Sequence, residues 1–220
     1  MATSEAQQRQ ALNRLYDLAK RELGDALALV PDPADTAAVV EVITTYVPAI
    51  CERYGLAAGT LAADWYEDLR DQAEAAGYFR AVMSDLPDRR RYEALAAWAA
   101  TKDDIETLVG GGVQRIIANM HRHTVMQSAF ADPAADGWAR FGNGATCDFC
   151  LMLVSRGGIY RESSATFATH DHCDCGAGPI WKGLAGARQV DAYKASARRR
   201  SDSTRESDNA RARAWIESNL

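Results

Sequence analysis

The chain has 220 residues, of which 47% are hydrophobic and 25% are charged, and its formal net charge is −5. This length and composition fit one large domain or two small ones with a sizeable core. No run approaches the roughly 18 apolar residues of a membrane-spanning helix. The polar start of the chain, Met1–Arg9, lacks the apolar stretch of a signal peptide. We therefore expect a protein made in a cytoplasm, with no membrane partner.

Apolar residues recur at helical spacing in five segments of the first 131 residues. These segments are 12–30, 39–54, 61–69, 92–98 and 105–120. We expect Gly55 to end the second segment, and Asp103 or Asp104 to cap the fifth. Cys51 lies alone on an apolar face and is expected in the core. Gly110–Gly112 interrupts the fifth segment, where we expect a bend or close helix packing, because glycine disfavours a helix interior.

The composition changes at Asp132, after which glycine and proline punctuate the chain until about Leu184. Such punctuation is typical of short strands and turns. The remainder of the chain has helical but weakly apolar periodicity. The sequence therefore predicts a mainly α fold in three parts: a helical domain at 1–131, a small zinc-binding α+β unit at 132–184, and a charged C-terminal helical tail at 185–220.

The last part of the chain is basic, with nine basic and five acidic residues from Lys182 onward. A solvated helix is the simplest interpretation of this pattern. A weak contact with DNA or with an acidic protein face is compatible with it.

Four of the five cysteines fall within 29 consecutive residues. In a cytoplasmic chain of this size, such clustering favours metal binding over disulfides. Cys147 and Cys150 have the spacing of a zinc knuckle, and His170, Cys173 and Cys175 follow about twenty residues later. The sequence predicts that these five residues supply the ligands of one structural Zn²⁺ site.

The candidates outnumber the four positions of tetrahedral zinc. His170 is preferred over His172, because His172 directly precedes Cys173 and adjacent residues rarely reach one ion. Cys173 and Cys175 cannot be ranked, since alternate residues of an extended segment face the same way. A set of reduced core cysteines and a redox dithiol at the CxxC pair are the alternatives.

We expect no catalytic residues. A thiolate-rich shell makes zinc a poor Lewis acid, so a structural metal is favoured over a catalytic one. No GxSxG motif supports Ser155, Ser163 or Ser164 as a nucleophile. His121 and His123 do not share a helix face, so they are poor joint ligands and are expected at a boundary surface.

The stretch from Gly144 to Trp181 contains CDFCLMLVSRGGIY and HDHCDCGAGPIW. It resembles the C-terminal region of phage Mu F-like minor head proteins, whose pattern is CxxC, a turn, and then HxxCxC. The form HxHCDC is similar to versions in tailed phages of actinobacteria. The segment YGLAAGTLAADWYEDLR, Tyr54–Arg70, also resembles the helical part of that subgroup.

The resemblance implies a virion component inside the capsid, near the portal vertex, that acts in head assembly. Its implied partners are the portal and the capsid or scaffold proteins, and no small-molecule substrate is expected. Members of the actinophage subgroup also carry the name capsid maturation protease. A peptidase that processes capsid or scaffold protein is therefore the alternative to a structural minor head protein.

Overall fold

The computed structural model describes residues 5–32, 34–99, 101–102, 104–142, 146, 148–155, 157–158, 171, 173, 175–182, 210, 214 and 218. Cys147, His170 and His172 lie outside these residues. Of the predicted tail, only residues 210, 214 and 218 are described, and each is helical.

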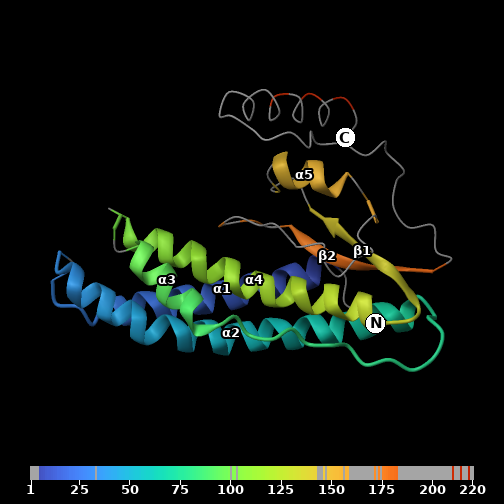
Figure 1. Cartoon of the computed structure of the whole chain (residues 1–220), viewed down its shortest axis with the longest axis horizontal. Coiled ribbons are helices and arrows are strands. Elements are labelled where there is room, and N and C mark those ends of the chain that lie inside the picture. The colour runs from blue at the N-terminus through green and yellow to red at the C-terminus, as the bar shows by residue number, and fades with distance from the viewer. Residues whose placement is uncertain are drawn as a thin grey trace.

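Most of the described chain is helical. Its long helices are α1 Glu5–Leu27, α2 Thr36–Gln72, α3 Arg89–Ala99 and α4 Ile105–Ala131. Helices α1, α2 and α4 run side by side along the long axis of the molecule, and the shorter α3 packs beside α4 (Figure 1). None of the described helices is long and apolar enough to cross a membrane.

The predicted apolar stripes meet in one core between these helices. Residues spaced three and four apart lie on one helix face, so each stripe buries toward its neighbours. The buried residues of this core include Ala19, Leu23, Ile43, Val47, Ile50, Cys51, Val109, Val113 and Ile117. Cys51 therefore lies in the core, as predicted.

Helix α2 joins the second and third predicted segments into one helix, so the prediction that Gly55 ends a helix is wrong. The reason is close packing. A Cβ atom on Gly55 would lie 3.1 Å from Cγ of Met120 on α4. One on Gly59 would lie 3.1 Å from Cγ of Met83. The contacts made possible by these two glycines offset a helix cost of about 1 kcal/mol each.

Helix α4 is continuous through Gly110–Gly112. Its N-cap is Asp104, whose side chain accepts a hydrogen bond from the Thr107 N–H at 3.2 Å. A Cβ atom on Gly112 would lie 2.5 Å from a methyl carbon of Leu95 on α3. The close packing expected in this run of glycines is thus confirmed at Gly112, where α3 lies against α4.

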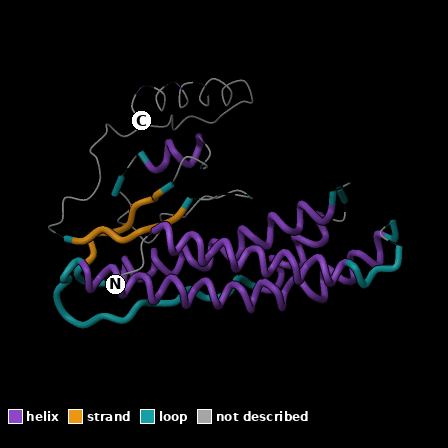
Figure 2. The backbone as a smooth tube through the Cα atoms, turned by 180° about the vertical axis from the view of Figure 1, so that it is seen from behind, coloured by secondary structure: helices purple, strands orange, loops and turns teal. Residues whose placement is uncertain are grey.

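The connection between α2 and α3 runs along the helices as an extended loop (Figure 2). Side chains of α4 hold it there. The Val82 N–H donates to Ser128 Oγ at 2.9 Å, and the Ser84 N–H donates to Thr124 Oγ1 at 3.0 Å. These bonds satisfy backbone donors that would otherwise be buried without partners.

Two short strands, β1 Ala135–Phe141 and β2 Gly176–Trp181, form an antiparallel sheet at one end of the helices (Figures 1 and 2). A short helix, α5 Asp148–Val154, lies over β1. The sheet packs on α4 and shares a second core with the long helices. That core contains Ala62, Trp65, Tyr66, Val125, Met126, Ala129, Ala135, Trp138, Cys150, Cys173, Cys175 and Ala177.

These elements confirm the predicted fold class, a mainly helical protein with a helical N-terminal region and a small sheet. The predicted division into units at residues 131 and 184 stays a prediction. The second core contains residues on both sides of the first boundary.

Candidate metal centre

Three cysteines converge where α5 meets the start of β2. Cys150 lies on α5, and Cys173 and Cys175 lie in the segment that leads into β2. Their exposed fractions are 0%, 6% and 3%. The Sγ atoms of Cys150 and Cys173 are 3.2 Å apart, and those of Cys173 and Cys175 are 3.0 Å apart. All three sulfurs lie within 4.8 Å of one another, so the cluster can hold a metal ion.

The sequence could not rank Cys173 against Cys175, and the structure brings both to the same place. Alternate residues of an extended segment face one side, and here that side faces Cys150. Two of the five predicted ligands, Cys147 and His170, lie outside the described residues.

The three thiols suit a soft, tetrahedral cation. The described cysteines are free, and their separations exceed the 2.05 Å of a disulfide bond. With zinc–sulfur bonds of 2.3 Å, a tetrahedron places its sulfurs about 3.8 Å apart. A shift of well under 1 Å in each sulfur would reach that spacing. This buried group of three thiols from two chain segments can therefore hold a metal ion.

Arg122 on α4 holds the segment that carries two of these thiols. Its Nε donates to the Cys175 carbonyl oxygen and its Nη2 donates to that of Cys173, both at 2.8 Å. Its Nη1 donates to Asn119 Oδ1 at 3.0 Å. The guanidinium is only 2% exposed. The fork of one buried arginine thus fixes the backbone on either side of residue 174.

A second arginine of α4 extends this attachment. Arg115 pairs with Asp171, with Nε 2.8 Å from Oδ1. Arg115 and Arg122 are seven residues apart and therefore lie on the same face of the helix. That face positions the cysteine segment from residue 171 to residue 175.

The thiols share their protons. The pKa of Cys173 lies below the ordinary thiol value, because its hydrogen bonds with the Cys150 and Cys175 sulfurs, and the Arg122 charge, favour the thiolate. The pKa of Cys150 is raised, because its proton is held in the bond to Cys173 and the group is buried. Hydrogen bonding within the cluster therefore favours the thiolate of Cys173, and the thiolate is the form that binds metals.

Aromatic rings surround the cluster. A Cβ atom on Gly176 would collide with the Phe141 ring, so only glycine lets that ring lie against the backbone beside Cys175. Phe141 in turn meets Trp65 edge-on, with ring centroids 5.9 Å apart. Trp181 packs on Tyr66 with ring centroids 5.4 Å apart. The thiols are thus shielded from water.

His121 was expected at a boundary surface, and this prediction is wrong. Its side chain is 3% exposed and its ring lies 5.8 Å from that of Trp65. Burial, helped by the neighbouring charge of Arg122, lowers the pKa of His121 to about 4. The imidazole is therefore neutral at neutral pH. His123 is partly buried, and it lines a groove together with the exposed side chain of Trp98.

Ser155 is the one serine candidate among the described residues, and its hydroxyl bonds to the backbone. Ser155 Oγ donates to the Met152 carbonyl oxygen at 2.7 Å. Among the described residues, no histidine hydrogen-bonds to Ser155. Ser163 and Ser164 lie outside the described residues.

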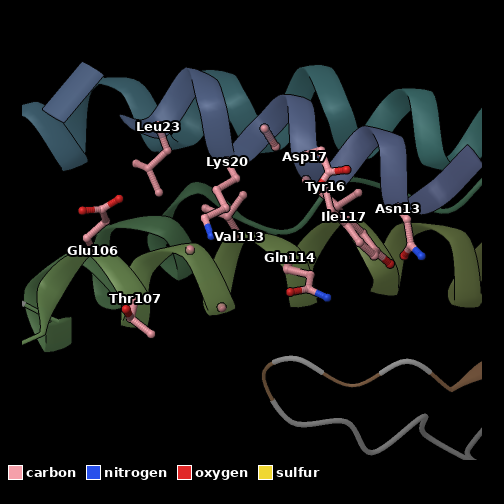
Figure 3. A pocket seen from close by; sticks show the side chains of 13 residues that line it. Asn13, Tyr16, Asp17, Lys20, Leu23, Glu106, Thr107, Val113, Gln114 and Ile117 are labelled. Atoms are coloured by element: carbon pink, nitrogen blue, oxygen red, sulfur yellow. The ribbon is translucent and has the colours of Figure 1, made fainter. Parts of the chain in front are cut away.

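A groove of about 460 Å³ lies between α1 and α4 (Figure 3). Asn13, Asp17 and Lys20 point into it from α1, and Glu106 and Gln114 point into it from α4. Its described lining contains no cysteine and no histidine. This groove is thus separate from the cysteine cluster and adds no ligand to it.

Fold and site together define a mainly helical protein with a small sheet and a buried three-cysteine cluster able to hold a metal ion. The sequence model of the VG15 protein family matches residues 1–200, and the chain belongs to this family of phage proteins. No curated protein and no solved structure matches the chain.

Proposed function

We propose that this chain is a structural minor head protein of a tailed phage, shaped at one end by a structural Zn²⁺ ion. Cys150, Cys173 and Cys175 would hold the ion, with Cys147 or His170 as the fourth ligand. The observation that carries the proposal is the convergence of three buried thiols from two segments beside α4. When bound, zinc would cross-link these segments and supply folding free energy.

Membership of a phage family supports a role in the virion. The Mu F-like pattern in the cysteine region supports a more specific role. In this role, a few copies of the chain lie near the portal, and the portal, capsid or scaffold proteins are its partners. An assembly part needs a fixed shape, and a zinc cross-link gives one to a glycine-rich segment with little apolar content.

Co-expression with the portal, capsid and scaffold proteins of the same phage tests this role. We expect the chain to sediment with assembled heads and to leave the other proteins uncut. The Cys150→Ser variant should lose zinc and be depleted from heads, while Cys51→Ser should behave as wild type. A chain that never enters heads would contradict the proposal.

The same experiment tests the alternative, a capsid maturation protease. That function needs a nucleophile and a base within hydrogen-bond reach. Cleavage of capsid or scaffold protein that is lost in Ser155→Ala, Ser163→Ala or Ser164→Ala, with zinc retained, would replace the structural role with an enzymatic one.

A further inference from the structure

Arg122 holds the backbone of the cysteine segment through two hydrogen bonds. It reaches from α4 to two carbonyl oxygens of the segment, those of Cys173 and Cys175. These are the two residues whose thiols must point at one ion. The contact therefore bears directly on the spacing of two ligands.

The shape of the guanidinium sets that spacing. Its N–H groups form a rigid planar fork, so two carbonyls bound to one guanidinium are held at a fixed separation and angle. With residues 173 and 175 so held, their side chains leave the same side of the segment toward Cys150. Lysine has one ammonium on a flexible stem and cannot impose this geometry.

The charge of Arg122 also bears on metal binding. Three thiolates and one divalent cation carry a net negative charge, and a fourth thiolate would increase it. In an apolar core such a charge costs free energy unless a nearby cation offsets it. Arg122 is buried and donates to the Cys173 and Cys175 carbonyl oxygens, so its charge lies close to the cluster.

We propose that Arg122 is a positioning residue of the metal centre, which orients the Cys173 and Cys175 thiols and offsets the negative charge of the loaded site. This inference rests on the proposed zinc site. It assigns a role to a residue that is not itself a ligand. Partners of this kind typically change metal affinity by about 10- to 100-fold when they are removed.

The test uses the full chain stripped of metal and titrated with Co²⁺, whose absorption bands report thiolate ligation and tetrahedral geometry. Zinc affinity follows from competition with a chromogenic chelator. Arg122→Met removes both the planar guanidinium fork and the positive charge, whereas Arg122→Lys removes the fork and keeps the charge. Arg70→Met is the matched control. Arg70 is also buried and also donates to backbone carbonyls, but its acceptors lie at residues 75–77 and not in the cysteine segment.

We expect Arg122→Met to weaken zinc binding about 10- to 100-fold. Arg122→Lys should recover part of the affinity but retain altered Co²⁺ bands, since the fork is lost. Arg70→Met should lower stability and leave affinity and bands unchanged. If Arg122→Met does not fold, the affinity and Co²⁺ bands of Arg122→Lys alone test the positioning role.

Wild-type affinity and bands in Arg122→Lys, together with wild-type affinity in any folded Arg122→Met, would overturn the inference. So would equal changes in the Arg122 and Arg70 variants, because the effect would then follow stability alone. A wild-type chain that binds neither Co²⁺ nor Zn²⁺ would instead refute the zinc site of the proposed function.

Discussion

Arg70 on α2 and Asp132 at the end of α4 form a buried ion pair, with Nε 2.9 Å from Oδ2. The Tyr66 hydroxyl donates to the same oxygen at 3.3 Å. The remaining donors of Arg70 reach the carbonyl oxygens of residues 75–77 at 2.6–3.2 Å. This network joins the end of α2 to the turn that leads into β1.

Removing either partner of this ion pair should lower the stability of the fold. In Asp132→Asn or Arg70→Met, one charge would stay buried without its counter-ion, and we expect the free energy of unfolding to fall by about 3–5 kcal/mol. Denaturant unfolding followed by circular dichroism measures this loss. The control is Arg53→Met, whose exposed pair with Glu22 should contribute less than about 1 kcal/mol. Equal losses at Arg70 and Arg53 would show that the buried network is not special.

Two glycines of α4 should respond to alanine in opposite directions. A Cβ atom on Gly110 would meet nothing within 4 Å, so Gly110→Ala should stabilise the protein by up to about 1 kcal/mol. One on Gly112 would overlap Leu95, so Gly112→Ala should destabilise it by about 1–3 kcal/mol. Thermal unfolding of both variants checks the signs. If both variants gain stability, the close packing of α3 on α4 is wrong.

The long helices could be predicted because their apolar residues recur at helical spacing, and the faces that this spacing defines are the faces that pack in the core. The end predicted at Gly55 failed for a tertiary reason. A glycine in a helical pattern marks either a stop or a close neighbour, and only the position of Met120 distinguishes them.

The cysteine cluster could be predicted in part. The spacing of Cys173 and Cys175 correctly placed both thiols on one side, but Arg122 was missed, because a charged residue in a helix normally indicates solvent. One signal was available. The last third of α4, from His123 to Ala131, contains no Asp, Glu, Lys or Arg, which indicates that this part of the helix is buried on most sides.

His121 should make the protein acid-sensitive. Its folded-state pKa of about 4 lies below the ordinary value of 6.5, so the unfolded chain binds more protons between these values. Its contribution to stability is therefore complete above about pH 6.5 and is lost as the pH falls toward 4, with a loss of about 2 kcal/mol at about pH 5.

Urea unfolding of wild type and His121→Gln in the same buffers measures this dependence, because any metal release would affect both proteins alike. The variant cannot protonate and should lose less stability than wild type between neutral pH and about pH 5. Parallel pH dependences in the two proteins would mean that the buried imidazole does not control acid stability.

The metal content of the purified full chain tests the central claim most directly. Elemental analysis should find about one equivalent of zinc in wild type, as expected for a single structural site. Cys150→Ser, Cys173→Ser and Cys175→Ser should each lose it, while Cys51→Ser, altered at a buried thiol of the helical core, should keep it. A wild-type chain that is free of metal and still holds its sheet and α5 folded would contradict the account.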